Sequence, residues 1–467
     1  MSTPEITPEL TAVDHADRAF AGHPKGLGYL TFTELWERFS YYGMQNLLVL
    51  YMVNYLLLPG NTAQIIGFET FRSLFGLSNT EGQPLASAIY GNYTAFVYLT
   101  PILGGLLADR LLGRRYTVLA GAIIMATGHF LMAFNATFLF ALLCLVIGSG
   151  CFKGNIASQV GALYKPEDQR RADAFQIYYL GINLAGIVTP LVVGTLGEKV
   201  GWHYGFGAAG VGMLLALVIY ISGQRYLPAD TVTQRNKVAK KPPRKALTRT
   251  EWQAIAALVL LIPVLAFSIV PNNQIFNAYL VWGDQRFDLT FFGFRIPTTY
   301  LTSIDAVTSI SFLAIVALFY RWYGKRWSEP DELSKMIIGA AFSVAGMICL
   351  YMAAATTPAD HKITLFWPMM FELLNSIGFA HLLPVSLALF ARLAPVSLNA
   401  AVIGLYYLAF FGANKLVGYF GGFYETMATP AFWLMHAGFA AGAGTVFLLF
   451  KLTLAKRLMG GPAPAMA

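Results

Sequence analysis

The chain has 467 residues, of which 56% are hydrophobic and only 12% are charged, and its formal net charge is +8. A soluble protein carries about twice that charged fraction, so the composition excludes an ordinary soluble enzyme and predicts a polytopic membrane protein. The positive charge is then explained by topology and does not indicate nucleic-acid binding. The sequence contains no metal-ligand cluster, phosphate-binding glycine loop or nucleophile–base pair, so we expect neither an enzyme nor a cofactor.

Twelve apolar runs are long enough to cross about 30 Å of hydrocarbon as helices. The predicted spans are 27–58, 86–108, 115–135, 137–164, 172–197, 203–226, 251–282, 298–322, 335–356, 363–392, 397–424 and 430–455. Six precede and six follow a basic, proline-containing segment. The sequence therefore predicts an all-α integral membrane fold with twelve transmembrane helices in two six-helix bundles.

Polar segments set the expected organisation of the chain. We expect a cytoplasmic tail (1–24), an N-terminal bundle (25–226), a basic cytoplasmic linker (227–250), a C-terminal bundle (251–457) and a C-terminal tail (458–467). Lys and Arg are concentrated in the linker and in the loops on the side of the N-terminus. Cytoplasmic loops carry such an excess, so both termini are predicted to be cytoplasmic, with membrane lipid around the helices.

The first run, 27–58, carries a polar stripe. Its members fall at i, i+3, i+4, i+7, i+8 and i+11 and share one helix face: Glu34, Glu37, Arg38, Tyr41, Tyr42 and Gln45. An ionisable side chain near the middle of a membrane helix costs roughly 2.5–3.5 kcal/mol on insertion scales. Such groups persist where they face protein or a water-filled cavity. The stripe therefore predicts a substrate or proton pathway.

The segment after the second run reads Gly104-Gly105-Leu106-Leu107-Ala108-Asp109-Arg110-Leu111-Leu112-Gly113-Arg114-Arg115. It resembles the loop signature of the major facilitator superfamily. Members of that superfamily have two six-helix bundles with the substrate between them at mid-membrane. The resemblance implies that Asp109 and Arg110 belong to a conformational gate.

Three other runs add polar groups that can meet the stripe. Lys153 lies too deep in 137–164 to reach an interface by snorkelling, so it has either a structural partner or a place in the cavity. Tyr179 and Asn183 lie one turn apart in 172–197, and 86–108 contributes Tyr98. A lone buried Tyr or Asn usually makes a helix–helix hydrogen bond, but together with the charged groups these residues are expected to line one cavity.

These residues carry a resemblance to a known family. The stretch Glu34-Leu35-Trp36-Glu37-Arg38-Phe39-Ser40-Tyr41-Tyr42-Gly43, the segment 148–153 that ends at Lys153, and the segment 174–183 resemble, in order, motifs of the proton-dependent oligopeptide transporter (POT/PTR) family. The resemblance implies a symporter in the bacterial inner membrane that imports di- and tripeptides with protons. We also expect it to work as a monomer.

The same resemblance implies residue roles. Arg38 and Lys153 would hold the peptide carboxylate, and Glu34 and Glu37 would couple protons through that cation pair. The remaining expected contacts, to the peptide backbone, are Tyr42, Tyr98, Tyr179 and Asn183.

The C-terminal half departs from the family pattern. Asn272, kept as a candidate substrate contact, stands where the seventh helix usually has an acid, and Phe379 stands where the tenth usually has a glutamate for the peptide amino group. Gln45 replaces an arginine, so an outer gate built from an Arg–acid pair is not expected. Asp305 and Glu372 are acids in apolar runs and hence candidate proton sites. A hydrogen bond to a neighbour, or interfacial water, is the alternative explanation for both.

One other function stays open. Because the acid for the amino group is missing, a proton-coupled transporter of another small anion, such as nitrate or a carboxylate, is the alternative. A receptor or structural membrane protein gives no account of three ionisable groups on one embedded stripe.

Overall fold

A computed structural model gives the fold and describes residues 17–165, 167–229, 247–395 and 398–455. Within these ranges, twelve long helices correspond to the twelve predicted runs. They are α1 (Lys25–Tyr51), α3 (Gly82–Leu107), α4 (Arg114–Leu131), α5 (Phe138–Ala162), α6 (Arg170–Thr189), α7 (Trp202–Gly223), α9 (Arg249–Asn273), α11 (Tyr300–Tyr323), α12 (Glu332–Thr356), α13 (Phe366–Leu393), α14 (Asn399–Gly421) and α15 (Thr429–Phe450).

Shorter elements extend or connect these helices. The α-helices are α2 (Phe68–Leu74) and α10 (Ala278–Arg286), and β1 (Thr290–Phe291) pairs antiparallel with β2 (Phe294–Arg295). The 3₁₀ turns are Thr62–Gln64, Asn135–Thr137, Gln224–Tyr226, η8 (Gln274–Phe276) and Gly422–Tyr424. The π-helical turns are Met52–Leu56, Ala108–Leu112, η5 (Pro190–Gly194), η6 (Leu196–Val200) and Lys451–Ala455.

By length and composition, nine helices in the described ranges are able to span a membrane. The helices α1, α4 and α14 are not among the nine. For α1 the reason is visible in its sequence, because Glu34, Glu37 and Arg38 interrupt the apolar run. Their burial inside the protein removes them from lipid, so α1 still packs as a core helix.

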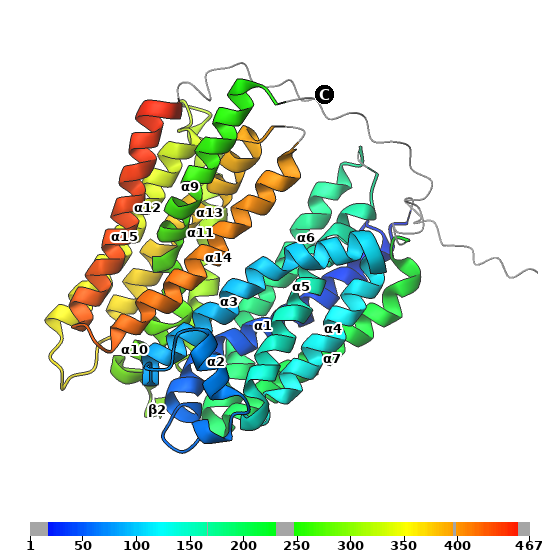
Figure 1. The fold of residues 1–467 in the computed structure, drawn as a ribbon. Helices are drawn as coiled ribbons and strands as arrows, with labels where there is room; N and C mark the ends of the chain where they lie inside the picture. Colours follow the sequence, from blue (N-terminus) through cyan, green and yellow to red (C-terminus); the bar gives the residue numbers. More distant parts are fainter. Residues whose placement is uncertain (1–16, 166, 230–246, 396–397, 456–467) are drawn as a thin grey trace, which may run out of the picture.

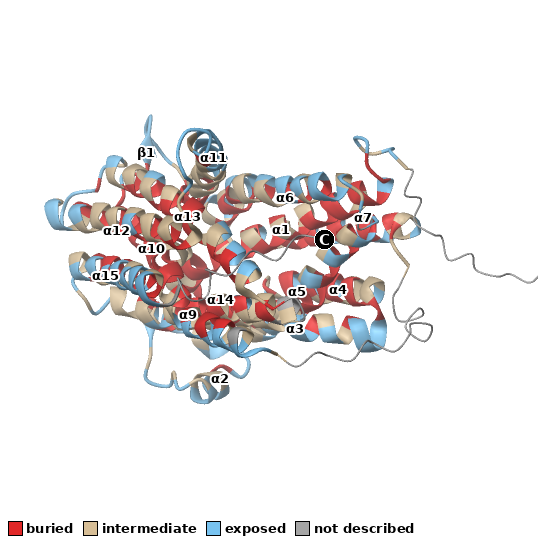
Figure 2. Cartoon of the chain, turned by 90° about the horizontal axis from the view of Figure 1, so that it is seen from above, coloured by how far each residue is buried: buried red, intermediate tan, exposed pale blue. Residues whose placement is uncertain are grey.

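The long helices form two bundles that lie side by side (Figure 1). One contains α1 and α3–α7 around a core that includes Leu47, Phe152 and Phe206. The other contains α9–α15 and has smaller, separate cores around Leu265 and Trp433. Figure 2 shows the buried positions on the helix sides that face neighbours and the exposed positions on the outside.

The predicted tail 1–24, linker 227–250 and tail 458–467 lie wholly or largely outside the described residues. The boundary between the halves therefore stays a prediction. One end of the molecule carries α2, α10 and the β1–β2 hairpin, which lie together at the bottom of Figure 1. We call it the α10 end.

The predicted run 251–282 lies within one candidate membrane span, Glu251–Arg286, but the helix is interrupted inside it. The helix α9 ends at Asn273, η8 follows, and α10 begins at Ala278. Pro271, inside the last turn of α9, has no N–H to donate, and Asn277 adopts φ −130° and ψ −107°, which no helix tolerates. The apolar run continues across this break, so hydropathy alone did not indicate it.

Candidate substrate cavity between the two halves

A cavity of about 310 Å³ lies between the two bundles. Residues of both halves line it. Among its lining residues are six of the predicted site residues: Arg38, Tyr42, Tyr98, Asn183, Asn272 and Asp305.

The polar stripe of α1 forms one wall of the cavity and also contains the acids that hold Arg38 in place. The Arg38 Nε atom lies 2.6 Å from Oε1 of Glu34, one helical turn earlier, and 3.1 Å from Oε2 of Glu37. Both carboxylates are buried, with 1% and 0% of the side chains exposed, whereas 14% of the Arg38 side chain is exposed. Of these three charged side chains only Arg38 lines the cavity, and the two acids are buried behind it.

Glu37 is held less firmly than Glu34. The Arg38 Nε atom donates a hydrogen bond to Glu34, whereas neither oxygen of Glu37 has a hydrogen-bond partner among the described residues. A buried carboxylate without hydrogen bonds is expensive to keep ionised. Glu37 is therefore held by its ion pair with Arg38 and by no hydrogen bond among the described residues.

Lys153 approaches the same wall from α5. Its Nζ atom lies 3.7 Å from the centroid of the Tyr41 ring and 5.8 Å from that of Tyr98. Gly150 permits this placement, because a Cβ atom there would lie 2.6 Å from Cβ of Thr100 on α3. Within the described ranges, Lys153 makes no ion pair or hydrogen bond. It is an unpaired cation beside the cavity.

The C-terminal half contributes two acids in different positions. Asp305 on α11 lines the cavity and accepts a long hydrogen bond of 3.4 Å from the Ser309 hydroxyl. Glu372 on α13 is fully buried and does not line it. The Glu372 carboxyl group lies toward Asp305 and Tyr279, but its oxygens and the Tyr279 hydroxyl have no hydrogen-bond partner in the described part of the chain.

Three of the expected site residues, Tyr179, Asp109 and Arg110, do not line the cavity. Tyr179 is 58% exposed and is not among the residues that line the cavity. Asp109 and Arg110 lie in the π-helical turn after α3, where Asp109 pairs with Arg114 at 3.8 Å. Gln45 lines the cavity and donates to the Tyr90 hydroxyl at 3.0 Å. Gln45 and Tyr90 both belong to the N-terminal half, so this hydrogen bond does not connect the two bundles.

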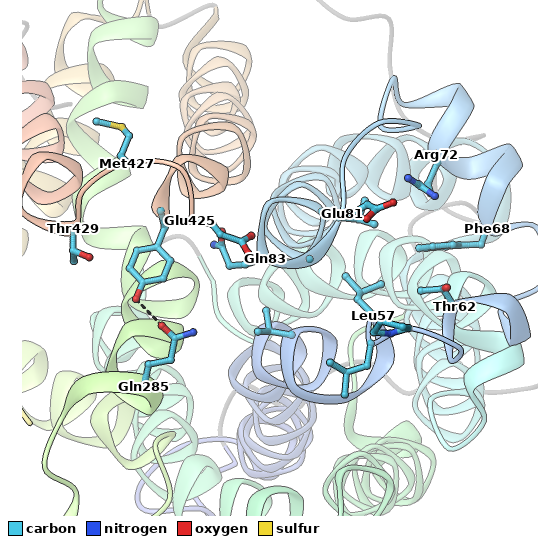
Figure 3. A pocket seen from close by; sticks show the side chains of 16 residues that line it. Leu57, Thr62, Phe68, Arg72, Glu81, Gln83, Gln285, Glu425, Met427 and Thr429 are labelled. Atoms are coloured by element: carbon cyan, nitrogen blue, oxygen red, sulfur yellow. Dashed lines mark hydrogen bonds between the residues drawn. The ribbon is translucent and has the colours of Figure 1, made fainter. Parts of the chain in front are cut away.

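A second hollow, of about 870 Å³, opens at the α10 end between α1, α3 and the loop before α15 (Figure 3). This hollow is larger than the cavity between the bundles, but its lining does not include an unpaired cation among the described residues. Arg72, its one lining cation among the described residues, pairs with Glu69 at 3.0 Å and donates to the Thr80 carbonyl at 3.1 Å. Its charge is satisfied within its own loop.

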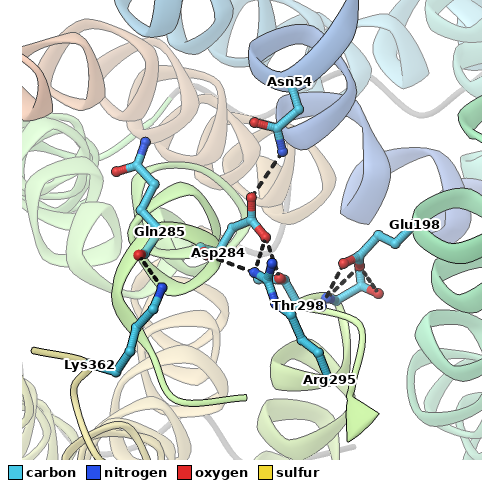
Figure 4. A network of polar contacts seen from close by, with 8 residues as sticks. Asn54, Glu198, Asp284, Gln285, Arg295, Thr298 and Lys362 are labelled. Carbon is cyan, nitrogen blue, oxygen red and sulfur yellow. Dashed lines mark hydrogen bonds and ion pairs between the residues drawn. The ribbon is translucent and has the colours of Figure 1, made fainter. Parts of the chain in front are cut away.

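Sequence reasoning missed a polar network at the α10 end (Figure 4). Asn54 on the N-terminal half donates to Asp284 at 3.0 Å, and Asp284 also accepts from Arg295 at 2.6 Å. Glu198 on η6 accepts from the backbone N–H of Thr298 at 2.7 Å. Two signals pointed to it: an acid directly after the run 172–197, and two threonines at the start of the run 298–322.

Comparisons with known proteins agree with this geometry. The model of the POT family matches residues 115–242 and 229–432, together more than half of the chain. The chain is 29% identical to the peptide transporter YePEPT of Yersinia enterocolitica, over 87% of this chain and 89% of that protein. It is 27% identical to a di-/tripeptide transporter of Lactococcus lactis, over 96% and 99%.

Solved structures give the same result. A crystal structure of peptide transporter POT with sulfate matches with a TM-score of 0.79 and 27% identity, over 95% of this chain and 97% of that one. A mutant of peptide transporter POT with alafosfalin matches with the same TM-score and identity. These matches confirm the predicted all-α membrane transporter fold and the family resemblance, and they identify a transporter rather than an enzyme.

Proposed function

The chain belongs to the POT family, and we propose that it is a proton-coupled symporter that imports di- and tripeptides by alternating access. Peptide transport is supported by the relatives. The coupling to protons is inferred from the charges around the cavity.

The arrangement of Arg38, Glu34, Glu37 and Lys153 carries the proposal. Two cations and two acids gather beside one cavity, and one of the cations, Lys153, is unpaired. With both acids ionised, the cluster is neutral. When one acid takes up a proton, the cluster becomes positive and favours an anionic group in the cavity. A peptide carboxylate held by Arg38 and Lys153 supplies that group.

Release follows from the reverse step. When Glu37 or Glu34 loses its proton, it competes with the substrate carboxylate for Arg38. In a low-dielectric cavity this competition is strong, so the cargo is expelled toward the side on which the proton leaves. We assign contacts to the peptide backbone to Tyr42, Tyr98, Asn183 and Asn272, which line the cavity. For Tyr179 we propose a contact to the peptide backbone only in a conformation in which the two halves have moved relative to each other.

Asp305 and Glu372 form a second proposed proton site. Asp305 faces the cavity and Glu372 lies behind it without hydrogen bonds, so one proton shared by the two acids would relieve their repulsion. A proton here would be exchanged with the cavity through Asp305.

The remaining proposals concern topology. The excess of Lys and Arg in the linker and in the loops on its side supports cytoplasmic termini in a bacterial inner membrane. Asp109 and Arg110 would then belong to the cytoplasmic gate, opposite the α10 end. We propose that a single chain is the functional unit.

One observation keeps a second candidate function open. Phe379 and Asn272 line the cavity, and neither offers a charge to a peptide amino group. A proton-coupled carrier of nitrate or a small carboxylate would need only the cation pair.

Uptake by liposomes separates the two candidates. The purified chain is reconstituted, a pH gradient (inside alkaline) is imposed, and uptake of labelled dialanine is measured with free or N-acetylated dialanine as competitor. A peptide symporter is expected to accumulate label and to prefer the free peptide as competitor. Equal competition by the N-acetylated peptide would favour the anion carrier, and no accumulation would refute proton-coupled peptide import.

A further inference from the structure

The described hydrogen bonds that join the two halves all lie between the α10 end and the cavity. Glu198 makes the densest set. Its Oε2 accepts from the Thr298 N–H at 2.7 Å, and its Oε1 accepts from the Thr299 N–H at 2.9 Å and the Thr299 hydroxyl at 2.7 Å. Glu198 belongs to the N-terminal half, whereas both threonines precede the first turn of α11 in the C-terminal half.

The partners of Glu198 suit a carboxylate. The first N–H groups of a helix have no acceptor within the helix, and the helix dipole favours a negative charge there. Thr298 and Thr299 are completely buried in this structure. Without Glu198, two backbone donors and one hydroxyl would be left in a dry interface between the halves, so this side chain is what allows α11 to dock there.

The backbone before Glu198 also allows the two halves to come into close contact at Thr299. A Cβ atom at Gly194, one turn before Glu198, would overlap the Thr299 hydroxyl. Ser303 donates to the Ile187 carbonyl at 2.9 Å, and the Thr195 and Tyr300 hydroxyls lie 2.9 Å apart. A continuous seam therefore runs along η6, η5 and α6 on one side and the first turns of α11 on the other.

Asp284 extends the seam to a third element. Its Oδ1 atom accepts from the Thr298 hydroxyl at 2.9 Å, and its Oδ2 atom accepts from Asn54 on the far side of the interface at 3.0 Å. Thr298 thus gives its N–H to Glu198 and its hydroxyl to Asp284, as Figure 4 shows. Asp284 therefore accepts from donors of both halves, and Glu198 carries a carboxylate of the N-terminal half to donors of the C-terminal half.

We propose that Glu198 is the latch that keeps the α10 end of the transport path closed. In an alternating-access carrier this end must open once per cycle. A latch made of hydrogen bonds to backbone N–H groups suits that task, because water can replace Glu198 at the helix end when the halves part. The latch rests on the proposed alternating access but not on which solute is carried, so it goes beyond the proposed peptide import.

The distance between spin labels tests the latch. Labels are placed at Tyr204 on α7 and Phe366 on α13, which are 66% and 61% exposed and lie in opposite halves near the α10 end. Cys144, Cys151 and Cys349 are first replaced. Distances are measured by pulsed electron resonance on the full chain in lipid, without cargo, so the result does not depend on which solute is carried.

The parent chain is expected to give mainly the short distance. In Glu198→Ala the ratio of long to short distances should rise about tenfold, because hydrogen bonds to a charged acceptor are lost. Thr299→Val removes one of the three bonds and should give a smaller rise, and Gly194→Ala should act as a wedge in the same direction. Glu81→Ala is the matched control, since Glu81 is an exposed acid at this end with no bond across the interface.

Unchanged distances in Glu198→Ala, or a change as large in Glu81→Ala, would overturn the latch. If Glu198→Ala does not fold, Thr299→Val and Gly194→Ala still decide the matter. Both act on the same contact without removing the carboxylate, and parent-like distances in both would refute the proposal.

Discussion

The amino group of Lys153 lies 3.7 Å from the centroid of the Tyr41 ring, and no carboxylate among the described residues pairs with it. A desolvated cation over an aromatic face gains about 2 kcal/mol or more, and the ring does not neutralise its charge. The contact therefore holds the cation beside the cavity and leaves it available for an anion.

The first prediction concerns this pair. Lys153→Ala should abolish proton-driven peptide uptake, because the cavity loses its unpaired positive charge. Tyr41→Leu should weaken substrate affinity by roughly 5- to 30-fold through loss of the cation–π contact, whereas Tyr41→Phe retains the ring and should stay close to the parent. Binding and uptake measured in the same liposomes check both. Equal losses in the Leu and Phe variants would show that the hydroxyl, not the ring, matters.

The second prediction separates coupling from binding. Glu37→Gln should abolish proton-driven accumulation but retain exchange of labelled for unlabelled peptide across the same membrane. The reason is that glutamine keeps the shape of a protonated Glu37 and cannot release a proton. Uptake with and without a pH gradient is the measurement, and Glu81→Gln, at an exposed acid of the α10 end, is the control. Full proton-driven uptake in Glu37→Gln contradicts the coupling scheme.

The sequence was sufficient for the helices and for half of the site. Length and hydropathy identify a membrane helix because the bilayer sets both, and the 3.6-residue period places Glu34, Glu37 and Arg38 on one face. For Lys153 the sequence offered either a structural partner or a place in the cavity, and the family resemblance favoured the cavity. Nothing in the spacing of residues on α1 and α5 says how those two helices pack.

The features that the sequence did not predict depend on how separate segments of the chain pack against each other. The break at Asn277 lies in a run that is apolar on both sides, so its composition resembles an unbroken helix. The Glu198 contact depends on how the two halves dock, which no local pattern encodes. Tyr179 matches the family motif, yet it lies away from the cavity in the conformation seen here.

The third prediction addresses the acid on the other side of the cavity. Asp305→Asn should reduce proton-driven uptake by about tenfold and flatten its dependence on the size of the pH gradient, because a titrating group that faces the cavity is lost. Ser309→Ala is the matched control. It removes a hydroxyl that makes a long hydrogen bond of 3.4 Å to the same carboxylate and lies 3.2 Å from the Ser376 hydroxyl, but it leaves the acid in place. Uptake should therefore change by less than about twofold. Parent-like gradient dependence in Asp305→Asn would remove this acid from the coupling path.

The fourth prediction concerns stability at the break between α9 and α10. Asn277 is fully buried, accepts from Ser87 of the other half at 3.0 Å, and donates to the Gln274 side chain at 3.2 Å and the Val417 carbonyl at 3.3 Å. Gly421 packs against its amide with no room for a Cβ atom.

Asn277→Ala should therefore lower the free energy of unfolding by about 1–3 kcal/mol, since buried polar partners are left without bonds. Thermal unfolding in detergent measures the change, and Gln64→Ala, at an exposed amide, should leave the midpoint unchanged. If both variants unfold at the parent's temperature, the side chain of Asn277 is not what holds the break in place, and the absent N–H of Pro271 must account for it alone.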